Sequence, residues 1–407
     1  MKAIGTTPHP QLRSLDIRPH TQAGQAYILL RDPTQISEHT LLIPQPLAAA
    51  LAFCDGTHDT QAMCRAFEEQ HGLALPKALV VQLLTALDEA LMLENDRTHQ
   101  ARAAALAAYC HAPFRPPALA GQAYPAEPHT LRLLLDTYLA DVAAEQPALP
   151  QATGLLSPHI DYARGGPVYA QVWKQAADLV KAADLVVMFG TDHYGNDPFT
   201  LTRQNYATPY GVLPTAQPVI NALTDAIGEQ AAFAGELRHR GEHSLELVIT
   251  WLHHMRGGEP CEFVPILCGG FHHFIADGTA PATDPLVNNV LDALRTATAG
   301  RRIAVIASGD LSHVGPAFGG RPLNLVDRAR LRGADDDLIA QMCRGSAENF
   351  FTSIRQVRDR NNVCGVSPVY LTLRLLDAAL GECTGYATCP ADEQDTSVVT
   401  VCGVLFG

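Results

Sequence analysis

Four apolar runs, each of which stops at a cluster of polar residues or glycine, most constrain the fold of this chain. They are GLLSPHID (154–161), ADLVVMFGTDHYG (183–195), CEFVPILCGG (261–270) and RRIAVIASGDLSH (301–313). Short β-rich runs of this kind, with helical stretches between them, indicate a sheet whose inner strands are covered on both faces. The sequence therefore predicts an α/β sheet covered by helices for residues 116–407.

Polar side chains come directly after these runs. In an open α/β sheet, ligands bind beyond the carboxyl ends of the strands, where we expect His159, His193, Asp310 and His313. A histidine-rich pocket suits a divalent transition metal, because neutral imidazole is a good nitrogen ligand near pH 7. The alternative for each histidine is a hydrogen-bonded residue in a turn. Near His159, the pair Gly165–Gly166 would let the backbone approach a bound group closely.

The motifs of several other enzyme classes are missing from the sequence. There is no GxSxG elbow, no GxxxxGK[ST] loop, no GxGxxG after a predicted strand and no HExxH pair. These absences argue against a serine hydrolase, a nucleoside-triphosphatase and a dinucleotide-dependent enzyme.

Composition and charge narrow the classes of partner. The chain has 407 residues, 47% of them apolar, and a formal net charge of −13, which repels polyanions. We therefore expect neither a nucleic-acid nor a membrane partner, and the N-terminal segment lacks the pattern of a secretory signal, so we expect a cytoplasmic protein. The ten cysteines include no CxxC pair, which argues against a disulfide framework or a structural zinc site.

The first 98 residues predict a separate small α+β domain. Residues 26–45 read as two short strands, and three helices follow near 47–56, 57–72 and 76–91. This order predicts a winged-helix unit. An Ala-rich helix and a Pro-rich segment, residues 99–115, then predict a linker to the domain at 116–407.

The N-terminal unit resembles the PqqD-like peptide-recognition domains, also called RiPP recognition elements. The resemblance rests on IPQPLAAALAFCDGTHDTQAM and LLTALDEALMLEND. In that family a peptide adds as a strand to the sheet edge. A DNA-binding winged helix is disfavoured, because residues 1–98 hold seven Lys or Arg against eleven Asp or Glu. The alternative to peptide docking is a plain packing domain.

The second domain resembles the Memo family, also known as AmmeMemoRadiSam system protein B. The resemblance rests on six blocks in order, which are SPHIDYARGG, GTDHYG, EHSLELVITWL, FVPILCGG, ASGDLSHVG and NNVCGVSPVY. That family is similar to the class III extradiol ring-cleaving dioxygenases, whose non-haem Fe(II) is held by two histidines and a glutamate. Their catalytic histidine follows a Ser-Gly-Gly-Leu-Ser pattern, to which residues 308–313 are similar.

The resemblance implies a mononuclear site in which His159, His193 and Cys364 bind the metal. The dioxygenases have glutamate at the position of Cys364. A carboxylate leaves open positions on Fe(II), whereas a thiolate is softer and also suits copper or zinc. We expect Fe(II) first, copper second and zinc third. His313 matches the acid/base histidine, and Asp310 would either orient a ligand histidine or cap the turn at the strand end.

The segment EHSLELVITWLHHM predicts a helix that starts near Glu242 or Ser244. His243 and Glu246 share one face of it. The family resemblance supports His243 as a pocket residue, while Glu246 would either line the pocket or lie in a solvated first turn. His272 has no ligand spacing, and we expect it at the surface or packed against other residues.

These observations predict a peptide-docking unit followed by a metal-binding domain. The metal site would serve a metal-dependent oxidoreductase that acts on a peptide or an aromatic small molecule. The family name implies a radical-SAM partner protein. The alternative is a non-enzymatic adaptor that holds a metal ion or a peptide in the same cleft.

Overall fold

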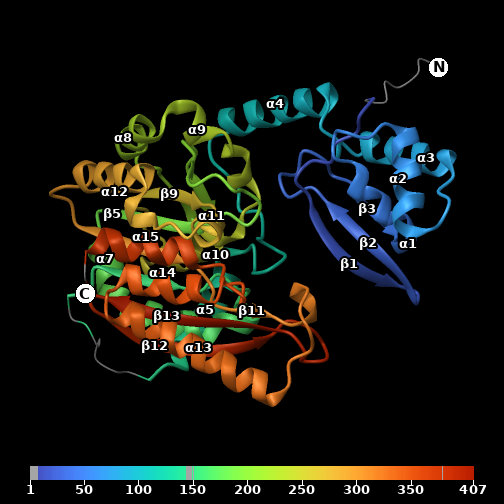
Figure 1. The fold of residues 1–407 in the computed structure, drawn as a ribbon. Helices are drawn as coiled ribbons and strands as arrows, with labels where there is room; N and C mark the ends of the chain where they lie inside the picture. The colour runs from blue at the N-terminus through green and yellow to red at the C-terminus, as the bar shows by residue number, and fades with distance from the viewer. Residues whose placement is uncertain (1–7, 144–148, 150, 378) are drawn as a thin grey trace. The chain divides into compact units, whose positions relative to one another are not determined.

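The computed structural model describes residues 8–143, 149, 151–377 and 379–407 (Figure 1). The chain divides into two compact units, the first ending at His111 and the second running from Ala112 to Gly407. Much of the segment 99–115, expected as a linker, is the helix α4 (Asp96–His111), and residues 112–115 belong to the second unit.

The first unit begins with a three-stranded antiparallel sheet in the order β1-β2-β3. The strands are β1 (Asp16–Gln22), β2 (Gln25–Arg31) and β3 (Thr40–Pro44). Ala23 and Gly24 join β1 to β2 with positive φ angles of 50° and 76°, as a two-residue hairpin turn requires. The sequence predicted β2 and β3 but not β1, because β1 is mostly exposed and carries Pro19, which suits an edge strand.

Helices follow the small sheet and share its core. They are α1 (Gln45–Ala48), a 3-10 helix (Ala49–Phe53), α2 (Thr60–His71) and α3 (Lys77–Glu89). The Asp59 side chain accepts hydrogen bonds from the Gln61 and Ala62 amides and so begins α2. Buried residues from the helices and the sheet form one core, including Leu30, Ile43, Met63, Phe67, Leu83 and Leu87.

The second unit is built on a mixed eight-stranded sheet in the order β11-β13-β4-β10-β5-β9-β6, with β12 beside β13. The four predicted apolar runs are its four parallel inner strands, β4 (Gly154–Ser157), β10 (Ile303–Ser308), β5 (Leu185–Thr191) and β9 (Glu262–Cys268). The prediction of an α/β sheet is therefore confirmed. The antiparallel strands are β6 (Thr200–Leu201), β11 (His313–Val314), β12 (Gly381–Pro390) and β13 (Val398–Phe406). A separate hairpin is formed by β7 (Tyr206–Thr208) and β8 (Gly211–Leu213).

Helices cover both faces of this sheet. One core contains residues of α8 (Gln217–Ile227), α12 (Pro285–Ala297), α13 (Leu325–Cys343), α14 (Ala347–Gln356) and α15 (Val366–Leu376). The other core contains residues of α5 (Pro128–Ala140), α6 (Tyr162–Gln175), α7 (Ala177–Ala182) and α10 (His243–Met255). Shorter helices lie in the connections, which are α9 (Glu229–Phe233), α11 (His272–Asp277) and 3-10 helices at Glu236–Arg240, Pro281–Thr283 and Pro316–Phe318.

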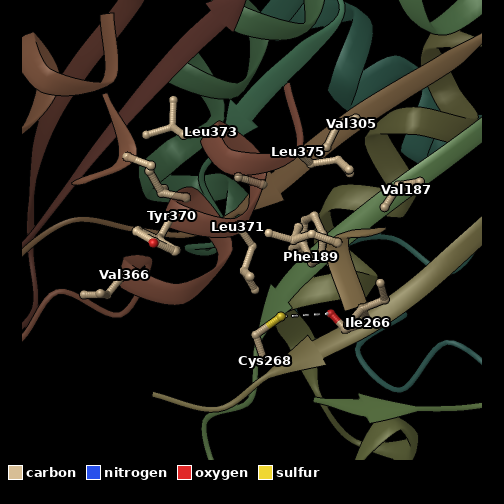
Figure 2. Packing of buried hydrophobic residues seen from close by; sticks show 14 of the residues in the cluster. Val187, Phe189, Ile266, Cys268, Val305, Val366, Tyr370, Leu371, Leu373 and Leu375 are labelled. Atoms are coloured by element: carbon tan, nitrogen blue, oxygen red, sulfur yellow. Dashed lines mark hydrogen bonds between the residues drawn. The ribbon is translucent and has the colours of Figure 1, made fainter. Parts of the chain in front are cut away.

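Successive residues of the inner strands alternate between the two cores. In β5, Val187 and Phe189 belong to the first core, whereas Val186 and Met188 belong to the second. Figure 2 shows Val187 and Phe189 beside α15 residues such as Leu371. Among the helices of the described residues, none combines the length and the apolar composition that crossing a membrane requires. The sheet thus forms a rigid platform whose carboxyl edge carries the polar residues.

Candidate metal centre

Three predicted ligands meet at the carboxyl edge of the parallel strands. His159 lies two residues beyond β4, His193 lies two residues beyond β5, and Cys364 comes shortly before α15. One ligand atom from each lies within 4.8 Å of the others, and the Cys364 Sγ is 3.2 Å from the His159 Nε2. Because β4 and β5 flank β10 on either side, the ends of the two strands bring these histidines together.

His159 is buried and fixed in one tautomer. The Ser308 hydroxyl donates to the Ser244 carbonyl at 2.6 Å, so its oxygen accepts from the His159 Nδ1 at 3.1 Å. The Nε2 lone pair therefore points to Cys364. Burial lowers the pKa of His159 well below its ordinary value, which keeps the ring neutral and able to bind a metal.

His193 is fixed by a carboxylate. Its Nδ1 lies 2.9 Å from the Glu242 Oε1, and its backbone amide donates to the Oε2 at 3.0 Å. Because a carboxylate only accepts hydrogen bonds, Nδ1 carries the proton and Nε2 is left for a ligand. Burial, the largest single influence, would lower the pKa of His193, but the charges of Glu242 and Cys364 and the hydrogen bonds to them together raise that pKa well above its ordinary value. A bound metal ion would have to displace this extra proton.

Cys364 supplies the sulfur donor. Its Sγ accepts a hydrogen bond from the Asp310 amide at 3.3 Å, and its carbonyl accepts from the Thr191 hydroxyl at 3.0 Å. Burial raises the pKa of the Cys364 thiol, so the sulfur is protonated until a cation replaces the proton. A Cβ added to Gly309 would lie 2.6 Å from the Gly365 Cα, which shows how closely the two backbones pass beside Cys364.

This donor set fits a transition metal. Two imidazole nitrogens and one sulfur converge, and each histidine uses its other ring nitrogen in a hydrogen bond to a fixed protein group. Such outer hydrogen bonds are found for almost all metal-binding histidines, and mixed nitrogen and sulfur ligands suit iron, copper and zinc. His159, His193 and Cys364 are therefore one group that could hold an ion, and two overlapping groups, His193 with Glu242 and His243 and Asp310 with His313 and Cys364, meet the same distance limit among the described residues.

The three residues predicted as catalytic lie around these donors. His243, the first residue of α10, stacks on His193 with ring centroids 4.4 Å apart, and its Nδ1 is 3.2 Å from the Glu242 Oε1. The His313 Nδ1 faces the carbonyls of Leu311 and Asn362 at 3.1 and 3.2 Å, which leaves its Nε2 as an acceptor. Burial lowers the pKa of His313 to about 4, so the ring is neutral near pH 7. The catalytic roles of both histidines stay predictions.

Asp310 holds the turn that carries His159. Its Oδ1 accepts from the amides of His159 and Ile160 at 2.8 and 3.3 Å, while its Oδ2 is 3.9 Å from the His159 Nε2. Burial raises the pKa of Asp310 to about 6. These contacts hold the backbone of the His159 turn, and the role of Asp310 in the site stays a prediction.

Two expectations about neighbouring residues are wrong. Gly165 and Gly166 lie inside α6, where an added Cβ would meet Ile160 and Tyr138 at about 2.4 and 2.5 Å, so these glycines serve close helix packing. Glu246 neither lines the pocket nor lies in a solvated turn. It is fully buried and forms an ion pair with Arg115.

The Glu246 carboxylate fixes the segment that leads into the second unit. It accepts from the Tyr124 hydroxyl at 2.6 Å and from the amides of Ala118 and Leu119 at 2.8 and 2.7 Å. The Arg115 guanidinium also donates to carbonyls just before α10, including that of His239 at 2.9 Å. This buried network supports the start of α10, where Glu242 and His243 lie.

A cavity of about 340 Å³ opens beside the donors. It is lined by His193, Cys364 and His313, and also by His272 and Asp359. His272 is exposed, as the sequence predicted, and it also lines this cavity. Burial raises the pKa of Asp359 to about 6. Sequence reasoning also treated Glu242 as a helix cap alone and missed its contact with His193.

The fold and the donor set define an α/β protein in which nitrogen and sulfur donors that could hold a metal ion meet at the carboxyl edge of the parallel strands. A sequence model of the family described as "Memo-like protein" matches residues 115–404. The chain belongs to this Memo-like family, which confirms the resemblance of the second domain.

Curated relatives agree with this assignment. The chain is 26% identical over 316 residues to a MEMO1 family protein of Aquifex aeolicus, covering 76% of this chain and 77% of the relative. It is 27% identical over 278 residues to one of Methanosarcina barkeri, covering 67% and 92%. It is 25% identical over 296 residues to one of Archaeoglobus fulgidus, covering 72% and 99%. The family match begins at residue 115, so the resemblance of the first unit to PqqD-like domains stays a prediction.

Proposed function

We propose that the second unit is a mononuclear metal-binding domain in which His159, His193 and Cys364 bind one transition metal ion. The observation that carries this proposal is the convergence of three donor atoms within 4.8 Å. Both imidazoles are oriented by a hydrogen bond at their other ring nitrogen, Nδ1. Three protein ligands leave coordination positions open, as in catalytic sites rather than closed structural ones. Fe(II) is the first choice, copper the second and zinc the third.

We propose further that this site serves an oxidoreductase. A bound iron or copper ion would supply redox chemistry and polarise a substrate oxygen. His313 is neutral near pH 7 and has a free Nε2, so it can accept a proton from a substrate that lies in the cavity. The cavity volume of about 340 Å³ suits an aromatic small molecule or one side chain of a peptide.

The first unit would supply peptide docking. Its sheet leaves β1 paired only with β2 and β3 paired only with β2 among the described strands, so both sheet edges offer unpaired backbone groups to an added strand. A cytoplasmic system with a radical-SAM partner that makes or modifies the peptide would suit this arrangement. Comparison of peptide affinity between the full chain and a chain without residues 1–111 tests the docking role, which unchanged affinity would rule out.

Elemental analysis of anaerobically purified protein tests the metal site. We expect about one equivalent of iron, copper or zinc in the wild type and a large loss in His159→Ala and Cys364→Ala. His99→Ala and Cys64→Ala, in the first unit, are matched controls that should keep the metal. Full occupancy in both site variants would overturn the proposed centre.

Turnover separates the enzyme from the non-enzymatic adaptor. Metal-loaded protein is mixed with oxygen and with catechols or peptides, and the products are followed by mass spectrometry. A product that disappears in His313→Ala, while metal content is unchanged, supports the oxidoreductase. A metal-loaded protein that is inert toward every candidate favours the adaptor.

A further inference from the structure

A second cavity, of about 390 Å³, adjoins the cavity beside His193 and Cys364, which we call the metal cavity. Both cavities are lined by His313, Phe318 and Asn362, so these three residues form the wall that the cavities share. The second cavity also contains Arg321, Arg330 and Arg360, and we call it the arginine cavity.

The arginine cavity is positively charged in a chain of net charge −13. Arg321 is neutralised by Asp327, which accepts from it at 2.6 and 2.9 Å. Asp327 is the one carboxylate among the described residues that line the cavity. Neither Arg330 nor Arg360 forms a salt bridge within the described part of the chain, so the cavity retains two positive charges.

Apolar side chains complete the lining. Phe318 contacts the His313 ring edge to face, with centroids 5.2 Å apart, and Leu323 and Leu331 also line the cavity. Guanidinium groups match the geometry of carboxylate and phosphate oxygens, and apolar walls match the hydrocarbon that carries such a group. The lining therefore suits an anion with an apolar body rather than a free inorganic ion.

The loop between α14 and α15 links the two cavities. Arg358, Asp359 and Asn362 all have positive φ angles, of 52°, 47° and 54°, which side-chain-bearing residues rarely adopt. Hydrogen bonds hold this backbone, from the Val363 amide to the Asp359 carboxylate at 2.9 Å and from the His313 amide to the Asn361 carbonyl at 2.8 Å.

The backbone of residues 358–362 determines which side chain faces which cavity. It directs Asp359 to the metal cavity and Arg360 to the arginine cavity, and it reaches Cys364 two residues after Asn362. Several strained residues held together in this way are typical of binding loops.

We propose that the arginine cavity binds the carboxylate or phosphate group of the substrate, through Arg330 and Arg360. The apolar body of the substrate then passes Phe318 and His313 and places its reactive end in the metal cavity. The proposal of an anion site depends only on the residues that line the arginine cavity. The orientation of the bound molecule, with its reactive end in the metal cavity, rests on the proposed metal function.

The test uses the full chain, without and with metal, and ligand-observed NMR titration. Benzoate and phenylphosphonate are the two anionic probes, and benzyl alcohol is the uncharged control. We expect at least one anion to bind more tightly than benzyl alcohol, and the preferred anion identifies the group as carboxylate or phosphate. The double variant Arg330→Gln/Arg360→Gln should lower the affinity by about tenfold or more, as loss of charge-assisted hydrogen bonds predicts.

Arg344→Gln is the matched control, because Arg344 is an exposed arginine that follows α13 and lies outside the cavity. It should bind the anions as the wild type does. Equal anion affinity in the double variant and the wild type, or no anion binding to the wild type, overturns the proposal. Anion binding that persists in metal-free protein and in Cys364→Ala supports the arginine cavity even if the metal proposal fails, so the two proposals fail separately.

Discussion

Glu242 holds His193 at two points and at the same time begins α10. Its carboxylate accepts from the His193 amide at 3.0 Å, lies 2.9 Å from the His193 Nδ1, and accepts from the Ser244 amide at 3.0 Å. Burial would raise the pKa of Glu242, but His193 and His243 outweigh it and lower that pKa well below its ordinary value. One ionised side chain therefore couples a helix start to the orientation of a proposed metal ligand.

Replacement of that carboxylate should weaken metal binding. Glu242→Gln keeps the size of the side chain but removes its charge, and we expect a loss of about 10- to 100-fold in metal affinity, measured by chelator competition. Glu127→Gln is a matched control, because Glu127 begins α5 in the same way, through the His129 and Thr130 amides. If both variants lose affinity equally, helix capping rather than contact with His193 explains the effect.

The approach of two backbones beside Cys364 predicts a steric effect. Gly309→Ala would place a methyl group 2.6 Å from the Gly365 Cα, so the Cys364 turn must move. We expect loss of metal occupancy and a decrease of about 1–3 kcal/mol in the free energy of unfolding. Gly333→Ala, inside α13 with open space around it, should keep the metal and raise stability by about 0.5–1 kcal/mol. Normal occupancy in Gly309→Ala would contradict the argument.

The buried ion pair between Arg115 and Glu246 should matter for folding rather than for metal chemistry. Arg115→Ala leaves a buried carboxylate without its cation, and we expect a loss of about 3–5 kcal/mol in the free energy of unfolding, measured by urea denaturation. The same measurement on Arg302→Ala, whose exposed partner is Asp184, should show no comparable loss. Folded Arg115→Ala protein should still bind metal with the wild-type stoichiometry.

His239 predicts how stability depends on pH. Its Nδ1 lies 2.6 Å from the Tyr206 hydroxyl and its Nε2 lies 3.0 Å from the Thr200 carbonyl, a pattern that the neutral ring satisfies. Burial lowers the pKa of His239 to about 3. Below pH 6.5, His239 is protonated in the unfolded chain but stays neutral in the folded chain until the pH approaches 3. Its contribution to stability is therefore complete above pH 6.5 and decreases as the pH falls toward 3.

Unfolding of metal-free protein between pH 5 and 6.5 checks this sign. The wild type should lose stability with falling pH, and His239→Gln should show a smaller slope, by up to about 1.4 kcal/mol per pH unit. An unchanged slope in the variant would mean that His239 does not titrate on unfolding.

The inner strands and most of the donors were predictable from sequence for a physical reason. Strands buried on both faces must be apolar along their whole length, so β4, β5, β9 and β10 appear as uninterrupted runs that stop at the pocket. His159, His193 and Asp310 each lie two residues past such a run, which identified them before any distances were known. Cys364 follows no strand; its polar setting after Asn361–Asn362 was a hint, and the family resemblance gave it the role of ligand.

The misses depend on contacts between distant residues. Arg115 lies in a Pro-rich segment that reads as a linker, and its burial depends on Glu246, 131 positions later. The sequence around Glu242 predicts a helix cap, and that sequence pattern would be the same whether or not the carboxylate also contacts His193. His272 is exposed, as predicted, and only the position of α11 places it at the edge of the cavity.

The pairing of β4 with β13 has a consequence for the order of events during synthesis. His159 follows β4, which lies between β10 and β13, and its partner Cys364 is 205 positions further along the chain. A ribosome-bound chain that has exposed both histidines still lacks Cys364, the proposed sulfur ligand, and the strand that completes the sheet around β4. Metal binding would therefore follow translation of these segments, and the ion would bind to a pocket that has already folded. Metal content would then measure the fraction of the protein that has reached its native state.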